Sequence, residues 1–201
     1  SDQSMNEGGT KVLLLSASDV DEDELTYSIT AGTNILSSID GSTITFSVIN
    51  DDWNGSEEFT ASVTDGEYPQ DQTFTVTVEG VNDAPVLAEV SDVTYDEDLS
   101  SILDLSASDV DEDDLTFSIS GGTNITATLV DSQVTFTSVL DFNGSETFAV
   151  SVTDNEYTDS QIITATVIAI NDSPSLDIIS DQSMNEGGTK VLLLSASDVD
   201  E

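Results

Sequence analysis

A 22-residue segment occurs twice in the chain without a single change. Residues 1–22, SDQSMNEGGTKVLLLSASDVDE, recur as residues 180–201, and residues 91–112 are a diverged copy. The copies are offset by 90 and then 89 residues. A fixed period of this size indicates a tandem array of modules that stack on their neighbours in the chain. We therefore predict one repeat at 1–85, a second at 86–174, and the N-terminal part of a third at 175–201.

Within each repeat, short stretches rich in Val, Thr, Ile and Phe alternate between apolar and polar residues, which is typical of half-buried strands. No stretch has a useful helical period. In the first repeat we predict strands at Gln3–Asn6, Lys11–Leu15, Leu25–Ile29, Asn34–Ile39, Thr43–Val48, Glu58–Val63 and Thr73–Val78. In the second we predict Ile102–Leu105, Leu115–Ile119, Ile125–Leu129, Val134–Thr137, Thr147–Val152 and Ile162–Val167. About seven strands in ~90 residues predict an all-β fold of tandem seven-stranded, antiparallel Greek-key sandwiches of the immunoglobulin type. Trp53 and Phe142, each before Asn-Gly-Ser, are expected to plug the two cores.

The charge of the chain is extreme. It has 41 Asp and Glu residues, 2 lysines (Lys11 and Lys190), and neither arginine nor histidine, for a net charge of −39. Such like charge opposes a compact state, so cations from salt, a divalent metal or both must offset it. Binding to nucleic acid or to anionic lipid is excluded as a function. The chain lacks Cys, which rules out disulfides.

Other function classes find little support in the sequence. No apolar run approaches the ~20 residues of a membrane span, and no signal peptide opens the chain, as expected of an internal piece of a longer protein. Without His or Cys, and without a Ser beside a candidate base, we predict that the chain is not an enzyme. Carboxylate pairs of the glycosidase type are frequent, but tandem sandwiches imply no cleft for them.

Acidic residues recur at matching places in both repeats. The second strand is followed by Asp19, Asp21 and Asp23 in the first repeat and by Asp109, Asp111 and Asp113 in the second, and Asp198 and Asp200 begin the same run again. Glu7, Glu97 and Glu186 lie near the start of each copy, and Asp65 and Asp154 follow the sixth strand. The repeats meet at short joints, Asn82-Asp83-Ala-Pro and Asn171-Asp172-Ser-Pro, which proline stiffens.

Strand direction predicts that these acids converge. In a seven-stranded sandwich the loops after strands two and six lie at the end where the linker enters. Asp109, Asp111 and Asp154 should therefore gather around Asn82-Asp83. Glu7 reaches this joint only if its side chain faces along its module, and Asp52 or Asp141 could join from the far end. Crowded carboxylates without a counterion are costly, whereas Ca²⁺ takes 6–8 oxygen ligands in flexible geometry. Mg²⁺ demands a stricter coordination geometry, and Zn²⁺ would lack its preferred Cys and His ligands.

The chain resembles the cadherin-like tandem repeats of large bacterial surface adhesins. The resemblance rests on the early Glu (NEG, DED), A-S-D-x-D after strand two, N-G-S before strand six, V-T-D after it, and the V-x-x-x-N-D-x-P ending, and it spans essentially the whole chain. It implies Ca²⁺ between successive domains. The implied ligands of the first joint are Glu7, Asp52, Asn82, Asp83, Asp109, Asp111 and Asp154. Those of the second joint are Glu97, Asp141, Asn171, Asp172, Asp198 and Asp200. Asp19, Asp21 and Asp65 hold the matching positions in the first repeat.

The sequence departs from the family pattern in two places. The usual D-R-E triplet is reduced to Asp51-Asp52 and to Asp141 alone, and the D-x-N-D-N joint is shortened. Fewer ions per joint than in animal cadherins are expected from this. The EF-hand pattern fails at Glu24, which stands where the turn glycine belongs.

Several alternatives stay open at this point. Asp23, Glu24, Asp113 and Asp114 are expected to be solvated surface acids, and Asn82 and Asn171 could serve as turn residues before proline. We expect the chain to be a structural extender of a long extracellular adhesin or surface fibre, stiffened by Ca²⁺ at its joints. Its partners would be calcium ions, neighbouring repeats and, in a filament, other chains. The alternative is a module that itself recognises a glycan, ice or a protein.

Overall fold

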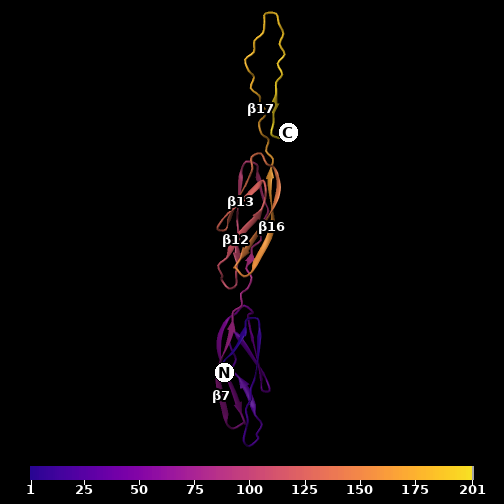
Figure 1. The fold of residues 1–201 in the computed structure, drawn as a ribbon. Coiled ribbons are helices and arrows are strands. Elements are labelled where there is room, and N and C mark those ends of the chain that lie inside the picture. The colour runs from indigo at the N-terminus through magenta and orange to yellow at the C-terminus, as the bar shows by residue number, and fades with distance from the viewer. Residues whose placement is uncertain (201) are drawn as a thin grey trace. The chain divides into compact units, whose positions relative to one another are not determined.

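The computed structural model describes residues 1–200, which form strands and no helix. The chain divides into two compact units, Ser1–Asp83 and Ala84–Glu201. We call these unit 1 and unit 2 and describe each by itself (Figure 1). No helix in residues 1–200 is long and apolar enough to cross a membrane.

Unit 1 is a sandwich of two sheets. Its strands are β1 (Gln3–Asn6), β2 (Thr10–Leu14), β3 (Thr26–Ile29), β4 (Ile35–Asp40), β5 (Thr43–Val48), β6 (Gly55–Thr64) and β7 (Pro69–Glu79). One sheet has the order β1-β7-β6-β3 and the other β2-β5-β4. The predicted bounds of β1 and β5 are correct. Strands β6 and β7 start several residues earlier than predicted, and each ends one residue later.

Unit 2 repeats this arrangement with additional strands. Its strands are β8 (Val86–Leu87), β9 (Val93–Asp96), β10 (Ser100–Asp104), β11 (Ala107–Ser108), β12 (Thr116–Gly121), β13 (Ile125–Val130), β14 (Gln133–Ser138), β15 (Gly144–Thr153), β16 (Thr158–Ile168), β17 (Ser175–Leu176) and β18 (Ala196–Ser197). The two main sheets have the orders β12-β15-β16-β9 and β10-β14-β13. The all-β sandwich predicted from the alternation is confirmed.

One expectation about strand direction is wrong. The first long strand of each repeat pairs in parallel with the last: β1 with β7, and β9 with β16. Strands that follow each other in the chain and are joined by a turn run in opposite directions. The first and last strands of a repeat are not joined in this way, because the chain enters the repeat through the first strand and leaves it through the last. Both run from the entering linker toward the leaving one, so they share a direction when they become neighbours.

Each sandwich is closed by its own apolar core. Unit 1 packs Phe46, Phe59 and Phe74 together, with ring centroids 5.0–6.4 Å apart. Unit 2 packs Phe136 against Phe148, edge to face at 5.2 Å. These side chains are at most 6% exposed, as the inward positions of alternating strands require.

The aromatic residue before Asn-Gly-Ser packs on the core, as predicted for Trp53 and Phe142. The glycine that follows explains the motif. Gly55 has φ +147°, and a Cβ there would come within 2.7 Å of the Trp53 ring. Gly144 has φ +142° and lies against Phe142 in the same way. Only glycine combines this backbone with so close an aromatic ring.

Candidate metal centre

The early glutamate of each repeat reaches the linker that leaves the same repeat. Glu7 follows β1, and its N–H donates to the carbonyl of Glu79 at 3.0 Å. Its Oε1 accepts the N–H of Val81 at 2.7 Å. Glu97 repeats this arrangement, because its Oε1 accepts the N–H of Ile170. The sequence left open whether this side chain faces along its module, and these hydrogen bonds show that it does.

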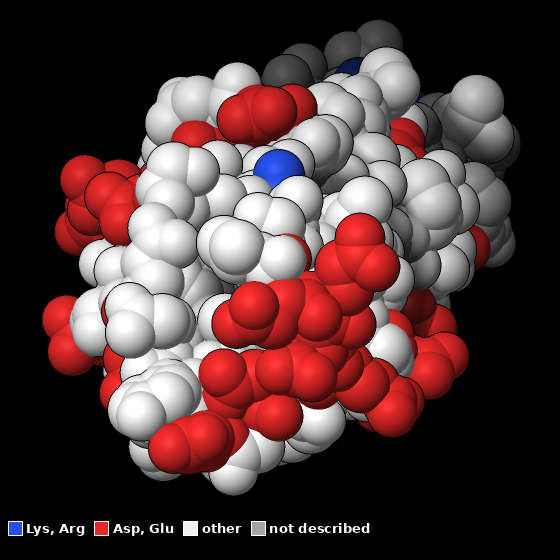
Figure 2. Space-filling view, turned by 90° about the horizontal axis from the view of Figure 1, so that it is seen from below, with Lys and Arg blue, Asp and Glu red and all other residues white. Residues whose placement is uncertain are grey.

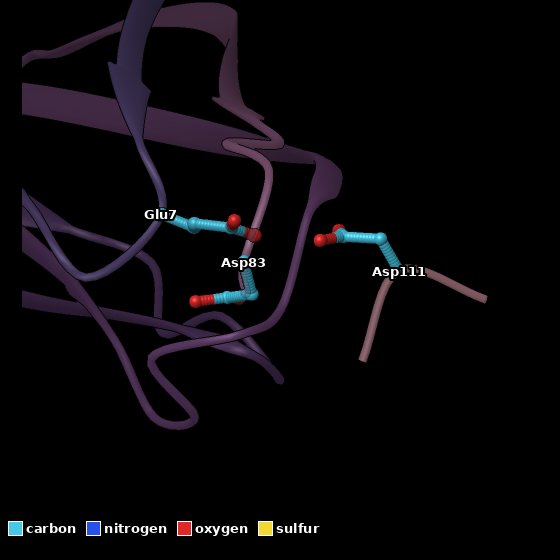
Figure 3. A group of neighbouring side chains, drawn as sticks. All are labelled: Glu7, Asp83 and Asp111. Carbon is cyan, nitrogen blue, oxygen red and sulfur yellow. The ribbon is translucent and has the colours of Figure 1, made fainter. Parts of the chain in front are cut away.

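In unit 1 the early glutamate lies beside the joint aspartate. Glu7 and Asp83 each offer a carboxylate oxygen, and these oxygens lie within 4.8 Å of one another. Figure 3 draws both side chains, together with Asp111, which belongs to unit 2 and is described with that unit. Glu7 Oε2 is buried and has no hydrogen-bond partner among residues 1–200. This oxygen is therefore available to a cation.

Unit 2 contains the most complete acidic centre. Oxygens of Glu97, Asp172 and Asp200 lie within 4.8 Å of one another, and so do oxygens of Asp98, Asp141 and Asp172. Asp172 belongs to both groups, and its N–H donates to Asp200 Oδ2 at 2.6 Å. We call these five residues the Asp172 centre.

The electrostatics of the Asp172 centre are unfavourable without a counterion. Glu97 is only 6% exposed. Burial raises the pKa of the Asp172 carboxyl, and the negative charges of Asp141, Asp200, Asp98 and Glu97 raise it further. Both causes disfavour the ionised form. A bound cation would reverse the effect of the charges, so the centre has the electrostatics of a cation site.

Asp98 was not among the predicted ligands. Its φ is +60°, a left-handed conformation that glycine adopts at the equivalent positions Gly8 and Gly187. Asp141 is also left-handed, with φ +56°, and its N–H donates to Asp98 Oδ1 at 3.2 Å. The signal in the sequence was an acid where the other two copies have glycine. Aspartate tolerates this backbone better than most residues, but at some cost.

The acidic run that follows the second strand forms a loop, and the first aspartate of the run accepts main-chain N–H groups from the residues after it. In unit 2, Asp109 Oδ1 accepts the N–H of Asp111 at 2.9 Å and that of Asp113 at 3.5 Å. Oxygens of these three residues lie within 4.8 Å of one another. Asp109 Oδ2 is buried without a hydrogen-bond partner in the described part of the chain. Asp19 and Asp198 accept the N–H groups of Asp21 and Asp200 in the same way.

Asp113 joins Asp109 and Asp111 in one acidic group of unit 2, and it also feels the charge of Asp154. Burial raises the pKa of Asp113, and the charges of Asp109, Asp111, Asp154 and Asp114 add to it in that order. Asp113 is exposed, as a surface acid should be, yet it belongs to the group. It occupies the third position of a D-x-D-x-D run, which the two-aspartate pattern did not include.

The aspartate after the sixth strand shapes its own turn. Asp154 is 8% exposed, and its Oδ1 accepts the N–H groups of Glu156 and Tyr157 at 2.7 and 2.6 Å. Asp65 makes the same two bonds to Glu67 and Tyr68, and these bonds lower its pKa. Each of these aspartates therefore orders the turn that follows its own strand.

Three further predicted ligands are Asn82, Asn171 and Asp52. The side-chain amides of Asn82 and Asn171 donate to the carbonyls of Asp83 and Asp172. Asp52 is exposed and is in none of the acidic groups found among residues 1–200. Its repeat counterpart Asp141 does belong to the Asp172 centre.

The donor chemistry of these groups suits a hard divalent cation. Carboxylates predominate, amide and main-chain carbonyl oxygens lie beside them, and the chain supplies no sulfur or imidazole. Acidic side chains also mass into one dense patch on the face drawn in Figure 2. In the Asp172 centre, Glu97, Asp98, Asp141, Asp172 and Asp200 would hold the ion.

Two other glutamates were missed by the sequence analysis and have a structural role. Glu146 in β15 accepts the N–H groups of Thr123, Asn124 and Ile125 at 2.7–3.2 Å, and Glu57 in β6 does the same for residues 33–35. Each closes the turn that comes before the next strand, β4 in unit 1 and β13 in unit 2. Asn124 also donates its side-chain amide to Glu146 at 3.0 Å, which ties this side chain to the same turn.

Acid should weaken unit 2 through Glu146. Burial opposes its ionisation, but the hydrogen bonds from Thr123, Ile125 and Asn124 outweigh burial and lower its pKa to about 2. Because the pKa of Glu146 is lower in the folded state, its ionised carboxylate stabilises the fold at pH values above its unfolded pKa, which is near 4.5. This contribution is lost as the pH falls toward 2. We expect Glu146→Gln to cost about 1–3 kcal/mol at pH 7 and almost nothing near pH 2. Urea unfolding at both pH values measures this, and an equal cost at both would contradict it.

Comparisons with known proteins agree with the geometry. The family model described as bacterial Ig domain matches residues 1–79 and again 82–166. Chitinase A of Pseudoalteromonas piscicida is 34% identical over 105 residues, which are 51% of this chain. The match covers only 13% of the length of that curated relative.

Solved cadherin structures share the fold. The first two extracellular cadherin domains of human protocadherin-24 match with a TM-score of 0.53 and 19% identity, over 78% of this chain and 87% of that one. Domains 1–4 of protocadherin gamma B7 match with a TM-score of 0.55 and 17% identity, over 98% of this chain and 57% of that one. Repeats of these kinds are typical of extracellular structural and adhesion modules. The chain belongs to the bacterial immunoglobulin-like domain family, as tandem sandwiches with a cadherin-like fold.

Proposed function

We propose that the chain is an extender segment of a long extracellular adhesin or surface fibre, and that Ca²⁺ bound at the joints between repeats stiffens it. The Asp172 centre carries this proposal. In this centre Glu97 is buried, and two clusters of three acidic residues have Asp172 in common. The pKa of Asp172 is raised. The sequence provides no arginine or histidine to neutralise it. Calcium supplies the missing positive charge.

The repeat extends the proposal to the first joint. Glu7, Asp83 and Asp111 hold the sequence positions of Glu97, Asp172 and Asp200. Gly8 stands in place of Asp98, and Asp52, the counterpart of Asp141, is exposed. The first joint thus has fewer carboxylates for a second ion. We propose that the joint at Asp172 takes up more calcium than the joint at Asp83.

Small-angle X-ray scattering tests the mechanical role. With millimolar Ca²⁺ we expect a longer maximum dimension and a narrower spread of conformations than with EGTA, because a bound ion fixes the joint. The comparison is made at ~0.5 M NaCl, where charges farther apart than a few ångströms are screened, so that repulsion alone does not extend the chain. Identical scattering curves in calcium and chelator would contradict stiffening. Mg²⁺ at the same concentration is the control for ionic strength.

The match to chitinase A favours a second candidate, a module attached to a polysaccharide-degrading enzyme that binds its glycan. The outer faces of the four-stranded sheets carry paired hydroxyl groups, such as Ser56 with Thr77 and Ser145 with Thr166. Insoluble chitin separates the two candidates. Depletion of the chain from solution favours the glycan-binding module, whereas no depletion in either calcium or EGTA leaves the extender.

A further inference from the structure

Unit 2 buries two hydroxyl groups in its core. Tyr95 in β9 is 7% exposed and belongs to the apolar cluster that fills the sandwich. Tyr95 Oη and Ser138 Oγ are both buried, and neither has a partner at normal hydrogen-bond geometry among residues 1–200. A buried hydroxyl without a partner is costly, so two of them in one core call for a physical explanation.

The two hydroxyls approach each other from opposite sheets. Tyr95 belongs to the four-stranded sheet, and Ser138 is the last residue of β14 in the three-stranded sheet. Because side chains alternate along a strand, Ser138 points inward with Val134 and Phe136. Burial raises the pKa of the Tyr95 phenol, the Ser138 hydroxyl lowers it in part, and the charge of Glu146 raises it further. The Ser138 hydroxyl therefore lies close to Tyr95 across the core.

Unit 1 has an apolar pair at the same two positions. The counterparts of Tyr95 and Ser138, each 90 residues earlier, are Met5 and Val48. They are 8% and 9% exposed and belong to the core of unit 1. A change at only one of the two positions would bury a single hydroxyl against an apolar side chain. The two positions differ together, as expected of residues that depend on each other.

Both strands that carry the hydroxyls lead into the Asp172 centre. Glu97 and Asp98 come two and three residues after Tyr95, and Asp141 comes three residues after Ser138. The N–H of Asp141 donates to Asp98 Oδ1 at 3.2 Å. The segments that follow β9 and β14 thus meet at the surface, while the hydroxyls of the same two strands meet in the core.

Unit 1 lacks the surface contact as well. Gly8 stands where unit 2 has Asp98. Asp52, the counterpart of Asp141, is in none of the acidic groups found in the described part of the chain. The buried hydroxyl pair and the acidic pair therefore occur together in unit 2, and unit 1 has neither. Their joint occurrence indicates that the two pairs act together.

We propose that Tyr95 and Ser138 are positioning residues of the Asp172 centre. Their hydroxyls bond to each other, directly or through one water, and so hold the end of β9 against the end of β14. Asp98 and Asp141 are then kept at the spacing that a shared cation requires, which lowers the cost of arranging the ligands. This inference rests on the proposed function, because it assigns the pair to the same cation site.

Urea unfolding of the full chain in EGTA, followed by the NMR signals of unit 2, tests the hydroxyl link without calcium. Tyr95→Phe and Ser138→Ala each leave one buried hydroxyl without its partner. We expect each to lower the folding equilibrium constant of unit 2 about fivefold. The double variant removes both hydroxyls and should lose no more than either single variant. Additive losses would show that the hydroxyls do not interact and would overturn the link.

A calcium titration of the full chain by NMR tests the positioning role. Glu97 accepts the N–H of Ile170, so this amide signal reports on the Asp172 centre, and the Val81 N–H, which Glu7 accepts, reports on the first joint. Tyr95→Phe should weaken the calcium binding seen at Ile170 about fivefold and leave that seen at Val81 unchanged. Destabilisation of the core alone would not move the Ile170 midpoint, because unit 2 stays folded during the titration.

Tyr27→Phe in β3 of unit 1 is the matched control. It removes the same hydroxyl, and its counterpart in unit 2 is already Phe117, so neither calcium midpoint should change. An Ile170 midpoint that is the same in Tyr95→Phe and Tyr27→Phe would overturn the positioning role. If the unsubstituted chain shows no calcium response at Ile170, the proposed function is wrong and the positioning role with it. The unfolding experiment in EGTA decides the hydroxyl link separately.

Discussion

Calcium should raise the melting temperature of the chain by about 10 °C or more, and EGTA should return it to the starting value. An ion that binds only the folded state at one hundred times its Kd adds about 2.7 kcal/mol per site. One kcal/mol shifts the melting of a domain of this size by roughly 4–8 °C. Because the carboxylates of the Asp172 centre also repel one another, the calcium-free state starts from a lower stability.

Scanning calorimetry in calcium, magnesium and EGTA measures this effect. Magnesium at equal concentration should give only a small part of the shift, because it keeps its waters and demands octahedral geometry. Equal shifts with Mg²⁺ and Ca²⁺ would identify general charge screening in place of a specific site. No shift with either ion would leave the acids as solvated surface groups.

The second large effect is expected from Glu97→Gln. The substitution keeps the size of the side chain and its hydrogen-bond acceptor for Ile170 but removes the charge. Loss of one carboxylate from a calcium site should weaken binding at the Asp172 centre by at least tenfold, since a paired charge of this kind contributes about 1.5–3 kcal/mol. Isothermal titration with Ca²⁺ measures the loss.

Asp131→Asn is the matched control for Glu97→Gln. Asp131 is exposed in the turn between β13 and β14, its φ of +54° suits asparagine, and the charge change is the same. Calcium binding should be unchanged in this variant. If both variants lose affinity equally, calcium responds to the net charge of the chain and not to Glu97.

The sequence predicted the strands well and their partners less well. Alternation of Phe, Val and Ile with Thr located the core positions of β5, and the repeat showed that unit 2 would copy unit 1. The parallel pair of first and last strands has no local signature, because neither strand carries information about a neighbour some 70 residues away. The two-residue β8 is too short to alternate, and only its pairing with Ala107 and Ser108 makes it a strand.

Much of the candidate centre was also named in advance, because its acids occupy positions that recur in each copy. Glu97, Asp172 and Asp200 were named as ligands through the resemblance to cadherin-like repeats, and calcium binding itself stays a prediction. Asp98 was missed because its position is glycine in the other copies, and its role depends on a left-handed backbone that only the folded chain reveals. Glu57 and Glu146 were missed because their ligands are main-chain N–H groups of a distant turn, which no sequence pattern marks.

The parallel pairing of the first and last strands of each repeat has a mechanical consequence. Force applied along the array pulls β9 toward one end and β16 toward the other. The four residue pairs between them are then loaded together in shear, so they cannot open one after another as in a zipper. Glu97, which follows β9 and holds the main chain just beyond β16, fastens the same pair at its end. Each repeat is thereby built to resist tension at the place where the chain enters and leaves.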